Sequence, residues 1–106
     1  MRFPKTIKVG PYVMDVKYEE DLEYEGDATL GLFSSHDLEI TLSADMNPQL
    51  EIGVFFHELV HAILWTTGAN YSEEYSENLC TSLGNGLMAF FKENKIDLFK
   101  VAKGDK

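Results

Sequence analysis

The longest periodic run of apolar residues in the chain extends from Asn47 to Gly68 and predicts a single helix of about five turns. Asn47 suits the N-cap, Pro48 the first helical position, and Gly68 the left-handed position just beyond the C-terminus. When the segment is wound at about 100° per residue, its apolar side chains point in nearly every direction, which is typical of a buried helix. We therefore expect this helix to form the centre of the fold.

Before this helix, four short runs alternate apolar and polar residues, as half-buried strands do. They cover Lys5–Val9, Tyr12–Tyr18, Ala28–Phe33 and Leu38–Leu42. The turn pair Gly10-Pro11 predicts a hairpin between the first two runs, and together the four runs predict a small antiparallel sheet. The acidic stretch Glu19–Asp27 has no periodicity and is expected to be a solvated loop rather than a cation site.

A second helix is predicted from Ser72, a good N-cap, to about Asn94, with acidic residues in its first turn. Its core face is expected to carry Leu79, Cys80, Leu83, Leu87, Phe90 and Phe91. Gly84 and Gly86 weaken the helix but permit close approach of another helix. The end of the chain is expected to form a short amphipathic segment, Ile96–Val101, followed by a frayed tail, Ala102–Lys106.

A sheet in the first half followed by two packed helices is the α+β pattern, and 106 residues with 44% hydrophobic composition support one domain, residues 1–106. The formal charge of −9 argues against nucleic acid or an anionic membrane as a partner. No apolar run is long enough to span a bilayer, and the single cysteine, Cys80, excludes an intramolecular disulfide. We expect a cytoplasmic monomer.

Three ionisable residues interrupt the apolar helix: His57, Glu58 and His61. The two histidines are four residues apart and therefore lie on one face, one turn above the other. His57-Glu58-Leu59-Val60-His61 is the H-E-x-x-H pattern, in which two imidazoles bind zinc and the glutamate acts as general base. Unpaired ionisable groups on a buried helix would cost several kcal/mol, which favours Zn²⁺ over two core histidines and a snorkelling glutamate.

A catalytic zinc usually takes three protein ligands, so one more is expected downstream. The candidates are Glu73, Glu74 and Glu77. If Leu83 marks the core direction of the second helix, Glu74 points nearly opposite, whereas Glu73 and Glu77 lie near one edge of the core face. Glu77 shares its edge with small residues that permit close approach of the first helix, which favours it over Glu73.

The H-E-x-x-H motif followed sixteen residues later by Glu77, then small Cys80, apolar Leu83 and small Gly84, resembles the compact gluzincin peptidases of the ImmA/IrrE type and their small phage-encoded relatives. The resemblance covers roughly residues 38 to 94. It implies a minimal zincin fold and zinc-dependent hydrolysis of a peptide or protein substrate, in the host cytoplasm if the chain is phage-encoded. The chain is shorter than the larger members of this family and lacks the alanine-rich sequence that they have around the third ligand.

In this interpretation Glu58 accepts a proton from an activated water and delivers it to the leaving amine. A donor to the developing oxyanion is also needed, and Tyr71, Tyr75 and His36 are the side chains available. The strand Leu38–Leu42 has two equal alternatives: it pairs with an extended substrate by β-addition, or its edge is covered by the rest of the fold.

The alternative is a non-catalytic zinc-stabilised binding module, or a phage assembly or regulatory module, on the same fold. Zinc is expected to contribute to folding in either case. A structural zinc site does not need a carboxylate beside its first ligand, so the presence of Glu58 favours the enzyme.

Overall fold

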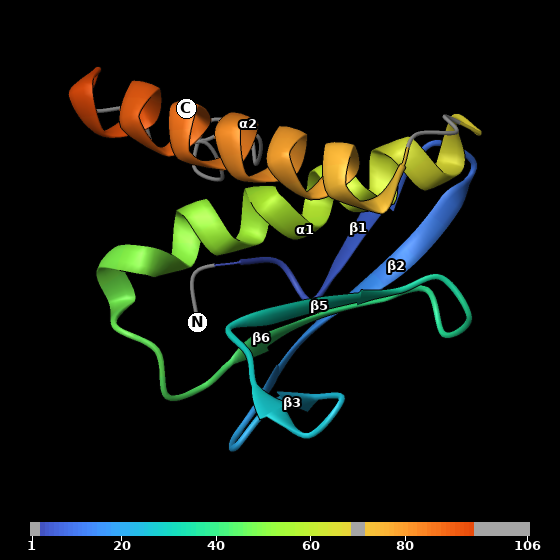
Figure 1. Cartoon of the computed structure of the whole chain (residues 1–106), viewed down its shortest axis with the longest axis horizontal. Coiled ribbons are helices and arrows are strands. Elements are labelled where there is room, and N and C mark those ends of the chain that lie inside the picture. The colour runs from blue at the N-terminus through green and yellow to red at the C-terminus, as the bar shows by residue number, and fades with distance from the viewer. Residues whose placement is uncertain (1–2, 69–71, 95–106) are drawn as a thin grey trace.

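The computed structural model describes residues 3–68 and 72–94. Its elements are β1 (Thr6–Val9), β2 (Tyr12–Glu19), β3 (Glu23–Tyr24), β4 (Asp27–Ala28), β5 (Gly31–Ser34), β6 (Glu39–Ser43), a 3-10 turn (Pro48–Leu50), α1 (Glu51–Thr66) and α2 (Glu73–Glu93). They form three layers, with α1 packed between one face of the sheet and α2 (Figure 1). The predictions for Tyr71, Ile96–Val101 and Ala102–Lys106 lie outside the described residues.

The main sheet has the strand order β1-β2-β6-β5, and the α+β class is confirmed. The predicted hairpin joins β1 to β2, with Gly10 at a φ of 59° in its turn. Two of the three pairings are antiparallel, but β2 and β6 run parallel, with Val16 opposite Ile40. Between these two strands the chain forms a small hairpin and then β5, which is antiparallel to β6. β6 therefore runs in the same direction as β2.

Of the two alternatives for the strand Leu38–Leu42, the covered one is correct, and this strand is not available for β-addition. β6 lies between β2 and β5 and is paired on both sides. The edge strand on that side of the sheet is β5, which also packs against α1.

The acidic stretch predicted as a loop contains a second, two-stranded sheet made of β3 and β4. Glu25 and Gly26 in its turn have φ values of 53° and 86°, the pair of positive values typical of a type I′ hairpin. Leu22 just before β3 is buried, which anchors the hairpin to the rest of the fold. The predicted strand Ala28–Phe33 is consequently divided between β4 and β5.

The central helix begins and ends as predicted, although its first turn is a 3-10 turn. The Asn47 side chain accepts a hydrogen bond from the amide of Gln49 at 2.9 Å, and Gly68 has a φ of 72°. Two consecutive aromatic residues of α1 contact different parts of the fold, the N-terminal segment before β1 and α2. Phe55 stacks on Phe3, with ring centroids 4.4 Å apart, and Phe56 stacks on Phe91 of α2 at 5.6 Å.

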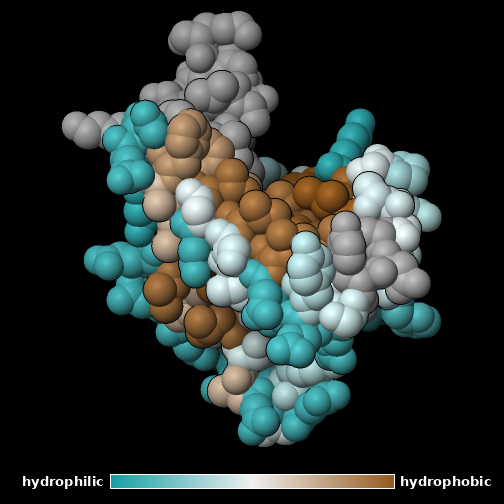
Figure 2. Space-filling model, turned by 45° about the horizontal axis from the view of Figure 1, so that its top comes forward, coloured by the Kyte–Doolittle hydropathy of each residue, from teal (hydrophilic) through white to brown (hydrophobic). Residues whose placement is uncertain are grey.

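The core combines apolar side chains from the inner face of the strands with side chains from α1 and from the segments before β1 and before α1. Its buried members are Phe3, Val9, Met14, Val16, Ile40, Leu42, Met46, Phe55, Phe56 and Ala62. The C-terminal half of α1 is less covered than expected, because Ile63 and Trp65 are both about two-fifths exposed. Figure 2 shows hydrophobic side chains gathered on the side of the molecule formed by the helices. Within the described residues, neither helix combines the length and the apolar character that crossing a membrane requires.

The second helix begins at its predicted cap, where the Ser72 hydroxyl accepts a hydrogen bond from the amide of Tyr75 at 3.2 Å. Its buried residues are Cys80 and Gly84, whereas Leu83 and Phe90 are 44% and 51% exposed. The predicted core face is therefore correct in part: Cys80 is buried and Leu87 and Phe91 pack against the core, whereas Leu83 and Phe90 do not. The physical reason is that α2 packs mainly on α1, and the residues it buries there are the small Cys80 and Gly84.

Gly84 makes the close helix contact possible. A Cβ atom built there would lie 2.9 Å from the carbonyl oxygen of Gly53 and 3.0 Å from the amide nitrogen of His57. Gly86 was expected to serve the same purpose, and this is wrong, because a Cβ atom there would meet nothing within 4 Å.

Candidate metal centre and its cleft

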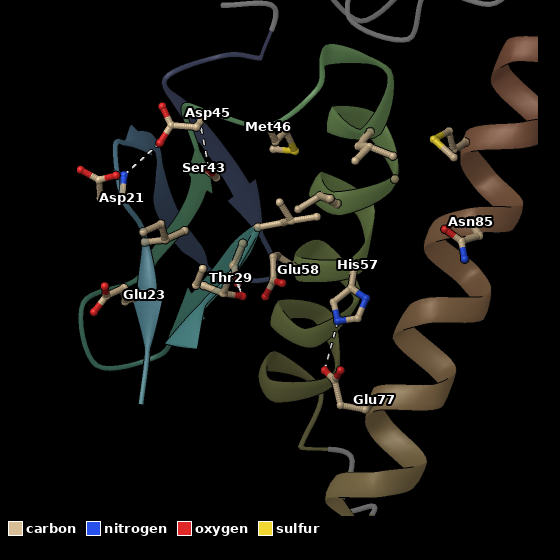
Figure 3. Close-up of a pocket in the computed structure, with 18 residues that line it drawn as sticks. Asp21, Glu23, Thr29, Ser43, Asp45, Met46, His57, Glu58, Glu77 and Asn85 are labelled. Atoms are coloured by element: carbon tan, nitrogen blue, oxygen red, sulfur yellow. Dashed lines mark hydrogen bonds and ion pairs between the residues drawn. The ribbon is translucent and has the colours of Figure 1, made fainter. Parts of the chain in front are cut away.

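The two histidines of α1 direct their imidazole rings towards α2, with ring centroids 5.0 Å apart. The Nε2 atoms of His57 and His61 lie 3.1 Å and 2.6 Å from the same oxygen, Oε1 of Glu77 on α2. One possible ligand atom from each of the three residues lies within 4.8 Å of the other two. Figure 3 shows His57 and Glu77 facing each other across the two helices. These three residues lie close enough to hold a metal ion.

Of the three glutamates considered, Glu77 is the one that the structure brings to both imidazoles. The close helix contact at Gly84, two turns further along α2, explains why its carboxylate reaches α1. Partial burial on its own would raise the pKa of Glu77, but hydrogen bonds with His61 and His57 outweigh it and lower that pKa below its usual value.

Glu58 lies on the sheet side of α1 and is only 8% exposed. It packs against Gly31 of β5, where an added Cβ atom would come within 3.0 Å of the Glu58 Cγ and 3.2 Å of its Oε2. Among the described residues none donates a hydrogen bond to its carboxylate, and none of their side-chain oxygens is both fully buried and unpartnered, so the Glu58 oxygens keep contact with the space beside them. Burial raises the pKa of Glu58, and the neighbouring His57 and His61 only partly oppose this effect. An ionisable group held in this way is typical of a functional site.

Sequence reasoning missed Thr81, which lies one turn beyond Glu77 on α2. Its Oγ1 is 3.4 Å from Nδ1 of His57. When His57 carries its proton on Nδ1 and donates it to Thr81, the lone pair of Nε2 faces Glu77 and is available to a metal. The spacing of four residues places Thr81 on the same face of the helix as Glu77, and this was the signal available in the sequence. Only the packing of α2 on α1 shows that Thr81 reaches His57.

A cleft of about 750 Å³ opens beside the three clustered residues. Its lining includes His57 and Glu58 of α1, Glu77 and Asn85 of α2, and Gly31 at the start of β5. Figure 3 shows the strands on one side of this cleft and α2 on the other. A molecule in the cleft would therefore contact Glu58 together with two of the three clustered residues, His57 and Glu77.

Of the predicted oxyanion donors, the two that the structure describes, Tyr75 and His36, are not brought to the cleft. Tyr75 lies in the first turn of α2 and His36 in the turn between β5 and β6, and both are exposed. Neither belongs to the cleft lining. The uncharged amide that does line it is Asn85, two turns beyond Glu77 on the same helix.

The comparisons with known proteins found no match to this chain among family models, curated proteins or solved structures. The H-E-x-x-H motif and the geometry of the residues around it are therefore the features of this chain that point to a function.

Proposed function

We propose that this protein is a zinc-dependent metallopeptidase in which His57, His61 and Glu77 hold the metal and Glu58 is the general base. The observation that carries the proposal is the position of Glu58: a side chain that is largely buried, has no hydrogen-bond donor among the described residues, lies beside His57, His61 and Glu77, and lines the cleft. Such a group costs stability, and it is explained if it acts on a bound substrate.

The donor set fits zinc. Two imidazole nitrogens and one carboxylate oxygen are a common ligand set for catalytic zinc, which keeps its fourth position open. When bound, the ion would supply Lewis acidity that polarises a peptide carbonyl and acidifies a water molecule. The side chains of His57 and His61 are 22% and 26% exposed, so the ligand cluster borders solvent, whereas a structural zinc site is closed by protein.

Other residues would then transfer the proton, orient a metal ligand and bind the substrate backbone. Glu58 takes the proton from the attacking water and passes it to the leaving amine, a transfer for which a raised pKa is suited. Thr81 fixes the ring orientation of His57. The edge strand β5 begins in the cleft at Gly31, so its free edge offers backbone groups to an extended peptide.

The test is peptide hydrolysis by wild type and Glu58→Gln, measured side by side on an unbiased peptide library. The amide of glutamine nearly matches the carboxylate in size but cannot accept the proton, so the variant should retain zinc and lose about 10²- to 10⁴-fold in rate. Glu73→Gln removes an exposed carboxylate one turn before Glu77 and should cleave like wild type. Equal cleavage by Glu58→Gln would refute the assigned role.

The second candidate is a zinc-stabilised module without catalysis, used for binding, phage assembly or regulation. It is favoured by one observation: the ligand cluster joins α1 to α2, and α2 has its main contacts with α1. A metal there would hold α2 in place whether or not a substrate is hydrolysed. Zinc binding without cleavage of any library peptide would favour this candidate.

A further inference from the structure

The cleft carries more negative charge than the proposed chemistry requires. Besides Glu58 and Glu77, its lining contains three further carboxylates, those of Asp21, Glu23 and Asp45. The described residues contribute neither lysine nor arginine to the lining. A bound zinc and two neutral imidazoles would balance the charges of Glu58 and Glu77, which leaves the other three carboxylates without a counterion in the cleft.

These three carboxylates are held on one side of the cleft by a defined set of turns. Asp45 accepts a hydrogen bond from the amide of Asp21 at 3.1 Å, and its own amide donates to the Ser43 hydroxyl at 3.2 Å. These contacts tie the turn before β3 to the segment that leads into α1. Glu23 follows on β3, and Figure 3 shows it, with Asp21 and Asp45, on the side of the cleft opposite α2.

Besides its charged residues, the cleft has a largely apolar lining. Leu50 and Val54 of the central helical segment, Met46 before it and Met88 of α2 all line it. An apolar lining that also contains carboxylates matches a side chain with a long aliphatic stem and a cationic head.

We propose that the cleft selects a substrate residue with a basic side chain, lysine or arginine, whose stem packs on the methionine-lined wall and whose charge is received by Asp21, Glu23 and Asp45. This inference rests on the proposed function for the reacting group, but it concerns binding and can be tested without turnover. An acidic side chain would be repelled by these carboxylates. A wholly apolar one would remove water from them without pairing their charge.

The binding experiment uses the zinc-loaded Glu58→Gln protein, which should not cleave the probes. Fluorescent pentapeptides of the form Ala-Ala-X-Ala-Ala, with X as lysine, norleucine or glutamate, are titrated and followed by anisotropy. Norleucine keeps the aliphatic stem of lysine without its amine. The lysine peptide should bind about five- to tenfold more tightly than the norleucine peptide at low salt, the glutamate peptide most weakly, and the advantage of lysine should shrink at high salt.

A matched pair of double variants separates a local contact from the general negative charge of the protein. Asp21→Asn with Glu23→Gln removes two charges from the cleft, and asparagine tolerates the positive φ of 54° at position 21. Glu25→Gln with Asp27→Asn removes two charges from the same hairpin but outside the cleft lining. The first pair should abolish most of the preference for lysine, whereas the second should preserve it.

Equal binding of the lysine and norleucine peptides, equal loss in both double variants, or no binding of any peptide would each overturn the inference. Cleavage of the same peptides by the wild-type zinc protein distinguishes failure of the binding inference from failure of the proposed function. If the lysine peptide binds selectively but is not cleaved, the peptidase proposal fails and the binding inference stands. If lysine and norleucine peptides are cleaved equally well, the peptidase proposal stands and the inference fails.

Discussion

Gly84→Ala tests whether the close contact of the two helices positions the metal ligands. The added Cβ atom would lie 2.9 Å, 3.0 Å and 3.3 Å from backbone atoms of Gly53 and His57, which cannot move aside as a flexible side chain would. Ordinary contacts begin near 3.4 Å, so α2 would have to retreat from α1 by about 0.5 Å. Overpacking of this kind costs about 1 to 3 kcal/mol.

The control is Gly86→Ala, because a Cβ atom there meets open space. Both variants gain about 1 kcal/mol of helix propensity, so this contribution cancels in their comparison and the difference reports the contact at Gly84. Gly84→Ala should unfold at a temperature about 5 °C or more below Gly86→Ala, measured by circular dichroism on the metal-free proteins.

The same displacement should carry Glu77 away from the histidines. Zinc affinity, measured by competition with a chromophoric chelator, should fall on the order of tenfold in Gly84→Ala and remain unchanged in Gly86→Ala. If Gly84→Ala matches Gly86→Ala in both melting temperature and zinc affinity, the helix contact does not set the geometry of the site and this reasoning is wrong.

Three further predictions concern single side chains near the site. Thr81→Val should weaken zinc binding by about tenfold while Thr81→Ser retains it, because only the hydroxyl can accept from His57; the same competition assay measures both. Burial raises the pKa of Glu58, so its ionised form destabilises the metal-free fold above that pKa. Glu58→Gln should therefore raise the melting temperature of the metal-free protein at pH 7 but not below pH 4.5. Equal shifts of the melting temperature at both pH values would contradict this prediction. Burial, together with the nearby carboxylates of Glu77 and Glu58, raises the pKa of the Cys80 thiol to about 11, so Ellman's reagent at pH 8 should label Cys80 only after unfolding.

The two helices and the cluster of His57, His61 and Glu77 could be predicted from the sequence because the signals are local. Asn47, Pro48 and Gly68 bound the first helix, Ser72 starts the second, and the four-residue spacing of the histidines fixes their common face. The preference for Glu77 is supported by the contacts, although Leu83 does not mark the core direction from which it was argued. The small residues beside Glu77 were the better guide, because they form the contact with α1 itself.

The sheet was harder to predict, because strand order depends on pairings between distant residues. Alternation identified β2 and β6 but contains no information about their parallel pairing or about the interior position of β6. The β3–β4 hairpin was missed because its strands have two residues each and its composition is that of a solvated loop. Thr81 and Gly31 belong to the site only through packing between elements, which no local pattern reports.

The central claim is that one zinc ion binds between α1 and α2, and anomalous diffraction from zinc-soaked crystals tests it most directly. Data collected on both sides of the zinc absorption edge should show one strong peak, at about 2.0 to 2.2 Å from Nε2 of His57, Nε2 of His61 and a carboxylate oxygen of Glu77. The peak should be absent from crystals of His61→Ala treated in the same way. A zinc peak at another place, or none between these three residues at saturating zinc, would contradict the account.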